Sequence, residues 1–454
     1  MKPNLTLLII LIILISLMGI RYVHGNENAV ERGYKVLTEL PVLTSDFNQS
    51  TFDQVWRSWP THLRSSAERM SKEERTKIAY QRYGLSSRPG TTDKPLQYVV
   101  SEEGNWTMNC FTCHGGTIYG NPYPGAPNNK IALQTLTEEI RATKFRVGAA
   151  LSRMDLGALV IPLGTTNGTT NAVVFGMGLM NQRDTSLNYI PTAPKFFVHH
   201  DMDAPPWWYF YKKERLYIDG FAEKGHRGLM QFMLIPENGP EFFQKHEEDF
   251  RDVYAYLMSL RPPKFEGNIN RDLANKGRNL FESNCSDCHG TYGKNWTYPN
   301  LRIPLEEIQT DPVRLHALSV EGRTKYAHSW FAHAGETGEQ STITAPDGYV
   351  APPLDGIWAS SPYFHNGSVP TLWGVLRPKD RPAVWIRDSD ELDAKRVGTT
   401  YSSVDSVPTN NLDIGEKRSY FDTRVKGKSN QGHLYGESLS DEEVLAIIEY
   451  LKTL

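Results

Sequence analysis

Two copies of the motif Cys-x-x-Cys-His constrain this 454-residue chain more than any other feature of its sequence. The first lies in NCFTCHGG, residues 109–116, and the second in NCSDCHGT, residues 284–291. Together they contain all four cysteines of the chain. A pair of disulfides or a zinc ribbon would use the same cysteine spacing. Neither of those sites requires a histidine directly after the second cysteine of both pairs.

A histidine in that position is typical of covalent attachment of c-type haem. The two thiols add to the vinyl groups of the haem, and the imidazole that follows is carried to one face of the iron. We therefore predict two covalently attached haems, and no disulfide, because every cysteine is then used. The residues predicted to hold them are Cys110, Cys113 and His114 for the first haem, and Cys285, Cys288 and His289 for the second.

Because covalent haem is assembled outside the bacterial cytoplasm, the chain is expected to carry an export signal. Lys2 precedes the apolar run LTLLIILIILISLMGI, and Val23 and Gly25 offer a cleavage site for a signal peptide. We expect residues 1–25 to be that signal peptide and the mature protein to be periplasmic or secreted. The alternative is a retained anchor, and contact with a membrane is expected only in that case.

A segment with helical periodicity follows each motif. In the first, Phe250, Val253, Tyr254 and Leu257 form an apolar stripe that ends before Pro262. The second has a predicted capping box, in which Ser440 caps the helix and Glu443 lies three residues on. Its apolar stripe consists of Val444, Ile447, Ile448 and Leu451.

These patterns predict a mainly α fold with long irregular loops, which the 36 glycines and 28 prolines favour. We expect two cytochrome c-like haem domains, residues 96–265 and 266–454. Residues 26–95 are expected to form an N-terminal helical extension packed on the first of them, with Gly84 ending one of its helices. The net charge of −3, without any run of basic residues, argues against nucleic acid as a partner.

The chain resembles the bacterial dihaem cytochrome c peroxidase superfamily. The similarity lies in the two haem motifs and in PPLDGIWASSPYFHNGSVPTL, residues 352–372. Three further segments are similar to the dihaem rubber oxygenase branch of that group. They are GTTNAVVFG (168–176), DAPPWW (203–208) and NQGHLYGESLSDEE (430–443).

The ligands on the second face of each iron come from elsewhere in the chain. His433 lies in a polar, glycine-rich loop that gives an imidazole no packing role, and the resemblance also implies a distal histidine there. We therefore predict that His433 binds the second iron. His365, in PYFHNGS, is the alternative, either as a ligand or as a hydrogen-bond donor to a haem carboxylate.

For the first haem, the resemblance implies that the iron on His114 is the catalytic one, with an open or exchangeable site. The residues that could close that site are His199, His200, Met177, Met180 and Met202. The superfamily also implies a tryptophan between the two haems, and Trp208, beside Trp207, is our candidate. Phe221 and Phe232 could wall an apolar distal pocket, and the resemblance allows a calcium ion between the domains. Arginine and lysine usually pair with haem carboxylates, but the sequence singles none out.

Two classes of function follow. In the first, the chain is an oxidoreductase in which one haem activates peroxide or dioxygen, acting on those molecules or on an organic substrate, while the other transfers or stores electrons. In the second, it is a dihaem electron carrier with both irons six-coordinate. Either function requires a small redox protein or a small-molecule electron donor.

Overall fold

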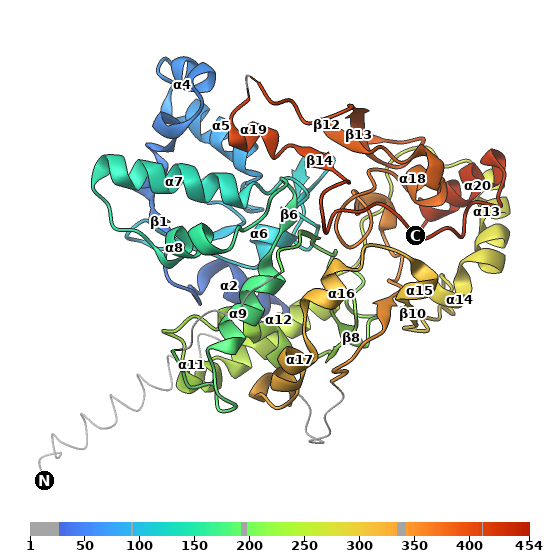
Figure 1. The fold of residues 1–454 in the computed structure, drawn as a ribbon, viewed down its shortest axis with the longest axis horizontal. Helices are drawn as coiled ribbons and strands as arrows, with labels where there is room; N and C mark the ends of the chain where they lie inside the picture. The colour runs from blue at the N-terminus through green and yellow to red at the C-terminus, as the bar shows by residue number, and fades with distance from the viewer. Residues whose placement is uncertain (1–26, 92–93, 192–197, 334–341, 411) are drawn as a thin grey trace, which may run out of the picture.

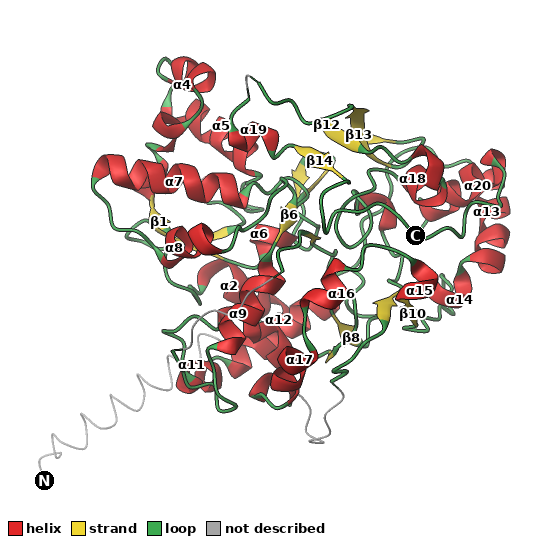
Figure 2. Cartoon of the chain, in the orientation of Figure 1, coloured by secondary structure: helices red, strands yellow, loops and turns green. Residues whose placement is uncertain are grey.

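The computed structural model describes residues 27–454, except 92–93, 192–197, 334–341 and 411. Helices account for 40% of the described residues and strands for 13%, the latter in several small sheets (Figure 2). The prediction of a mainly α fold is therefore wrong: the structure is mixed. The reason is that segments expected to be irregular loops pair as short antiparallel strands, which gives their backbone groups hydrogen-bond partners.

Before residue 260 the helices are α2 (Ala29–Glu39), α3 (Gln49–Phe52), η1 (Val55–Ser58), α4 (Thr61–Ala67), α5 (Lys72–Tyr83), α6 (Phe111–His114), α7 (Leu133–Val147), α8 (Arg153–Val160), α9 (Ala172–Asn181), α10 (His226–Met230), η2 (Gln231–Met233), α11 (Pro240–Lys245) and α12 (Glu247–Ser259). After residue 260 they are α13 (Arg271–Asn284), α14 (Ser286–His289), α15 (Leu305–Ile308), α16 (Val313–Ala317), α17 (Val320–Ala327), η3 (Trp330–Ala332), η4 (Ile357–Ala359), α18 (Leu372–Leu376), η5 (Pro378–Asp380), α19 (Ile414–Lys417) and α20 (Asp441–Leu451).

The strands form two three-stranded sheets and four two-stranded ones within the described residues. The three-stranded sheets have the orders β1-β3-β2 and β13-β12-β14. Their strands are β1 (Phe47–Asn48), β2 (Tyr98–Val100), β3 (Asn105–Met108), β12 (Val384–Asp393), β13 (Gly398–Ser403) and β14 (Tyr420–Asp422). The strand pairs are β4 (Thr117–Ile118) with β5 (Asn121–Pro122), β6 (Thr169–Thr170) with β7 (Met202–Asp203), β8 (Arg215–Leu216) with β9 (Ala222–Glu223), and β10 (Arg302–Pro304) with β11 (Gly348–Val350).

Each haem motif lies next to a pair of crossing helices (Figure 1). α2 packs against α12 beside the first motif, and α13 packs against α20 beside the second. A glycine lies at each crossing. A Cβ atom on Gly33 would come within 2.1 Å of the Asp252 carbonyl oxygen, and one on Gly277 within 1.8 Å of the Ala446 carbonyl oxygen. Both helix pairs therefore depend on a residue without a side chain.

The two closing helices confirm most of the sequence prediction. α12 buries Phe250, Val253 and Leu257, although its buried tyrosine is Tyr256 rather than Tyr254. α20 has the predicted capping box and buries all four residues of its predicted stripe.

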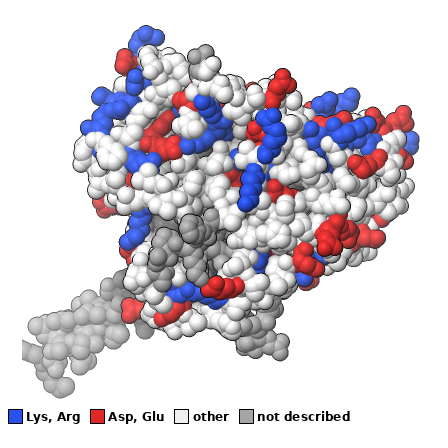
Figure 3. Space-filling model, viewed as in Figure 1, with Lys and Arg blue, Asp and Glu red and all other residues white. Residues whose placement is uncertain are grey.

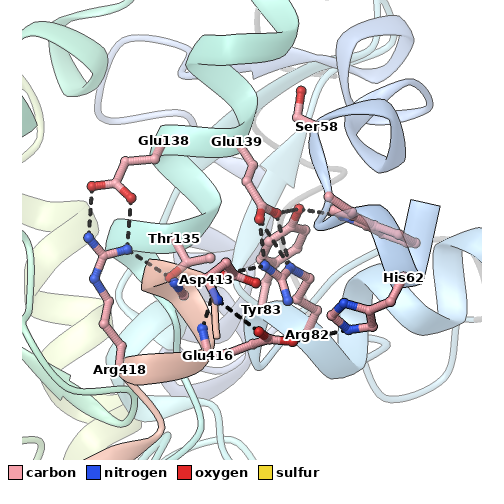
Figure 4. A network of polar contacts seen from close by, with 12 residues as sticks. Ser58, His62, Arg82, Tyr83, Thr135, Glu138, Glu139, Asp413, Glu416 and Arg418 are labelled. Atoms are coloured by element: carbon pink, nitrogen blue, oxygen red, sulfur yellow. Dashed lines mark hydrogen bonds and ion pairs between the residues drawn. The ribbon is translucent and has the colours of Figure 1, made fainter. Parts of the chain in front are cut away.

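The N-terminal extension shares an aromatic core with the residues that follow it, since Phe52 stacks on Trp106 of β3 with ring centroids 4.5 Å apart and side chains of α7 and α8 pack in the same core. Its helix α5 ends at Gly84 in the left-handed conformation, as predicted. A polar network joins this region to the C-terminal half of the chain (Figure 4). There Arg82 donates to Glu139 on α7, and Arg418 donates to both carboxylate oxygens of Glu138, at 2.7 and 2.8 Å.

Among the described residues no helix is long and apolar enough to cross a membrane. The apolar run predicted to be a signal peptide lies outside those residues. On the face drawn in Figure 3, acidic and basic side chains are interspersed. The expected domain boundaries, partners and location stay predictions.

Candidate haem-binding site

Each Cys-x-x-Cys-His motif forms a single helical turn. The backbone N–H of His114 donates to the Cys110 carbonyl at 3.2 Å, and that of His289 donates to the Cys285 carbonyl at 3.0 Å. The turn brings the two sulfurs of each motif together and places the imidazole just beyond them, as covalent haem attachment requires. None of the four thiols forms a disulfide. Burial raises the pKa of Cys110 to about 12, so that thiol is protonated.

The imidazoles of both motifs are held in the same way. His114 Nδ1 lies 3.0 Å from the Pro205 carbonyl oxygen, and His289 Nδ1 lies 2.8 Å from the Pro352 carbonyl oxygen. Each of these prolines belongs to an Ala-Pro-Pro sequence that directly follows a short strand, β7 or β11. Such a contact fixes the ring orientation and leaves Nε2 free to bind a metal. Burial lowers the pKa of His114 to about 4, which keeps the imidazole neutral, as ligation requires.

One cavity of about 1070 Å³ is lined by both motifs and mostly by apolar side chains. Its volume is at the upper end of the range of small-molecule sites, roughly 300–1,000 Å³. The histidines that line it in the described part of the chain are His114, His289, His365 and His433. A cavity that opens onto both pairs of thiols and both imidazoles fits haem as the group it holds.

His433 faces His289 across this cavity, with ring centroids 6.3 Å apart. An imidazole nitrogen binds a metal at about 2.0–2.1 Å, as zinc sites show, so the spacing leaves room for one metal ion between the rings. Burial lowers the pKa of His433 to about 3, so its ring is neutral as well. The arrangement fits the predicted role of His433 at the second haem.

The backbone around His433 is held tightly. The N–H of His433 donates to the Ile308 carbonyl at 2.8 Å, and His433 has a φ of +53°. A Cβ atom on Gly432 would lie 2.3 Å from the Gln309 carbonyl carbon, so this position requires glycine. Arg381 donates to the Gly432 carbonyl at 2.8 Å and to the Gly374 carbonyl at 2.8 Å. Sequence reasoning missed Arg381, since nothing around it marks it as a residue that positions a ligand.

His365, the alternative ligand for the second haem, occupies a different position from His433. The ring centroid of His365 lies 4.6 Å from that of Tyr349, and its Nε2 is buried without a hydrogen-bond partner among the described residues. The residues after it support the loop that leads to His433, because Asn366 donates to the Ser429 carbonyl at 3.0 Å. The segment PYFHNGS thus braces the His433 loop, while the ring that faces His289 is that of His433.

The residues proposed as second axial ligand of the first haem do not gather at one position in the structure. His199 Nε2 pairs with Asp201 at 3.0 Å, and its Nδ1 lies 2.7 Å from Asn171 Nδ2, so both ring nitrogens have partners. The cavity lining includes Met202 but not His200, Met177 or Met180.

The cavity wall near the first motif is mostly apolar, with side chains from α8, α9 and η2, among which Arg153 of α8 is charged. Phe232 contributes to it as predicted, whereas Phe221 packs in the core against Tyr217, with ring centroids 4.7 Å apart. This wall therefore suits a small apolar molecule better than it supplies a side chain that could bind the first iron.

Trp207 and Trp208 connect the surroundings of the two motifs. The Trp207 ring stacks on His114, with centroids 4.6 Å apart and planes 24° apart. Trp208 is fully buried, and its indole N–H donates to the Asp355 carbonyl at 2.6 Å, three residues after Pro352. Gly356 has no room for a side chain here, since a Cβ atom would lie 2.7 Å from the Trp208 indole nitrogen. Trp208 was chosen from the sequence, whereas the contact of Trp207 with His114 was not foreseen.

Among the residues that the structure describes, no group of three or more histidine, cysteine, aspartate or glutamate side chains could hold a separate metal ion. The calcium ion that the resemblance allows stays a prediction.

The model of the RoxA-like, cytochrome c-like family matches residues 348–386. This range begins at β11 and includes Pro352, Asp355 and His365. The match shows a relationship to RoxA-like cytochromes c and, with it, a haem cofactor.

Two proteins of Sinorhizobium fredii (strain NBRC 101917 / NGR234) are similar to the chain. Uncharacterized protein y4iJ is 32% identical over 261 residues, covering 44% of this chain and 42% of that protein. Uncharacterized protein y4iM is 29% identical over 241 residues, covering 44% of this chain and 53% of that protein. The chain thus spans about half the length of these curated relatives.

Proposed function

We propose that the chain is an exported dihaem c-type cytochrome that acts as an oxidoreductase, of the dihaem peroxidase superfamily and closest to its rubber oxygenase-like branch. The observation that carries this proposal is the asymmetry of the cavity. A second imidazole faces His289, whereas apolar side chains from α8, α9 and η2 line the cavity near His114. Haem iron transfers electrons where both axial positions are firmly held, and activates peroxide or dioxygen where one is open.

In this proposal the chain's residues have distinct roles. Pro205 and Pro352 orient the imidazoles of His114 and His289 through their carbonyl oxygens. The apolar wall excludes water from the first site and favours an apolar organic substrate or a small oxidant there. Trp207 and Trp208 fill the space between the first imidazole and the loop that orients the second. An external electron donor, either a small redox protein or a small molecule, would supply the second haem.

Electron paramagnetic resonance of the oxidised protein tests the proposal. We expect one low-spin signal from the haem on His289 and one high-spin signal from the haem on His114. Two low-spin signals, unchanged when peroxide is added, would favour the alternative of a dihaem electron carrier. Met202, which lines the cavity, is the residue to test as the sixth ligand in that event.

A further inference from the structure

Five aspartate, lysine and arginine residues line the cavity, and three of them are basic: Arg153, Arg314 and Lys213. Arg153 pairs with Glu237, and Arg314 pairs with Asp219 at 3.2 Å, although within the described residues its Nε and Nη2 are buried without a hydrogen-bond partner. Asp287 lies on the exposed side of α14. Burial raises the pKa of Asp203 well above its usual value. The fifth residue is Lys213.

Lys213 has no hydrogen bond and no ion pair within the described part of the chain. Its ammonium lies over the Tyr209 ring, 5.9 Å from the ring centroid. Burial lowers the pKa of Lys213 to about 8. The neighbouring lysine differs in this respect. Lys212 pairs with Asp355 at 2.9 Å, and its ammonium lies over the Trp296 ring. A lysine that faces a cavity without a partner is costly to keep unless an anion enters that cavity.

The position of Lys213 indicates which anion that is. It lies on a segment that runs from Trp207, which stacks on His114, to Ile218, whose carbonyl accepts a hydrogen bond from Val350 at 2.7 Å. Val350 ends β11, just before the Pro352 that orients His289. The segment that carries the lysine therefore contacts the surroundings of both motifs. A haem attached through its vinyl groups also carries two carboxylates. An ammonium group is a suitable partner for a carboxylate.

We propose that Lys213 binds a carboxylate of one of the attached haems and fixes the reduction potential of that haem. This inference rests on the proposed function, since it requires covalent haem. The ion pair has a direct electrostatic consequence: the ammonium offsets the negative charge of the carboxylate near the iron, which favours the reduced state. The same contact holds the haem edge in one position between the motifs.

The test compares Lys213→Met, Lys213→Arg and Lys224→Met. Lys224 is a matched control, because its ammonium donates to the Phe210 carbonyl at 3.3 Å and its side chain does not line the cavity. The thioether bonds keep haem in every variant, so each can be studied in the resting, substrate-free state. The readouts are the resonance Raman band of haem carboxylate bending and a redox titration of both haems.

We expect Lys213→Met to shift the carboxylate band and to lower the reduction potential of one haem. Lys213→Arg should keep both values close to those of the wild type, and Lys224→Met should change neither. An unchanged carboxylate band in Lys213→Met, with two haems attached, would overturn this inference and leave the proposed function intact. A wild-type protein without covalent haem would instead refute the proposed function.

Discussion

The imidazoles of His289 and His433 face each other with ring centroids 6.3 Å apart, although the two residues are 144 positions apart in the sequence. Three contacts hold this pair. Pro352 orients one ring, Ile308 fixes the backbone of the other, and Arg381 holds the loop that carries it. This second imidazole distinguishes the second motif from the first, because the histidines proposed for the first, His199 and His200, do not line the cavity.

His433→Ala should convert the second haem from low to high spin, since this substitution removes the ring that faces His289. His365→Ala should keep the low-spin signal, because that ring lies against Tyr349 instead. Electron paramagnetic resonance of the two oxidised variants measures both outcomes. A low-spin signal lost only in His365→Ala would transfer the ligand role to that residue.

Arg381→Lys should weaken the ligation by His433 while both haems stay attached. Lysine lacks the planar fork with which Arg381 reaches carbonyl groups on both sides of the loop. The expected result is a mixture of high-spin and low-spin signals that shifts toward high spin on warming. Arg424→Lys is the control, since Arg424 is half exposed and pairs with Asp422. Equal spectra for the two variants would count against a positioning role.

Trp208→Ala should slow electron transfer between the haems by about a hundredfold, which corresponds to about 2.7 kcal/mol of barrier. The Trp208 indole lies between the segments that contain Pro205 and Pro352, and its N–H donates to the Asp355 carbonyl. Stopped-flow reduction followed at each haem gives the rate, and Trp208→Phe separates the loss of the hydrogen bond from the loss of the ring. An electron-transfer rate in Trp208→Ala equal to that of the wild type would show that Trp208 is not on the electron-transfer path.

Asp201→Asn should lower the free energy of unfolding by about 3–5 kcal/mol, the cost of removing one partner from a buried ion pair. Asp201 is buried, pairs with Lys428 at 3.1 Å and accepts hydrogen bonds from Thr165 and Thr169. Urea unfolding measures the loss. Adding Lys428→Met to Asp201→Asn should recover part of it, because no unpaired buried charge then remains.

The carboxyl group of Asp201 should also make the free energy of unfolding depend on pH. His199 and Lys428 outweigh the effect of burial and hold the pKa of Asp201 below its usual value. A carboxyl group with a lowered pKa in the folded state stabilises the protein above its unfolded pKa of about 3.9, and that stabilisation is lost as the pH falls further. The wild type should therefore lose stability more steeply below about pH 4 than Asp201→Asn does. Parallel curves would contradict this account of the carboxyl group.

The sequence predicted the parts of the site that local chemistry determines. The two haem motifs, the capping box of α20 and the glycine that ends α5 depend on residues close together in the chain, and the structure has each of them in the expected local conformation. His433 could be nominated because a polar loop gives an imidazole no packing role.

The parts that sequence reasoning missed depend on pairing between distant segments. The two-residue strand β7 and the three-residue strand β11 are too short to show an alternating pattern, yet they place the Ala-Pro-Pro carbonyls against His114 and His289. The mainly α prediction is wrong for the same reason. The contact of Trp207 with His114 was not foreseen, because the turn at residues 207–210 directs Trp207, rather than its neighbour, toward the first imidazole.

The central claim is that each motif carries one covalent haem, and the intact mass of the denatured protein tests it most directly. We expect the wild type to exceed the mass of its polypeptide by two haem groups. The double variant Cys110→Ala/Cys113→Ala should retain only the second haem, and Cys285→Ala/Cys288→Ala only the first. A wild type with no added mass, or a double variant that keeps both haems, would contradict the account.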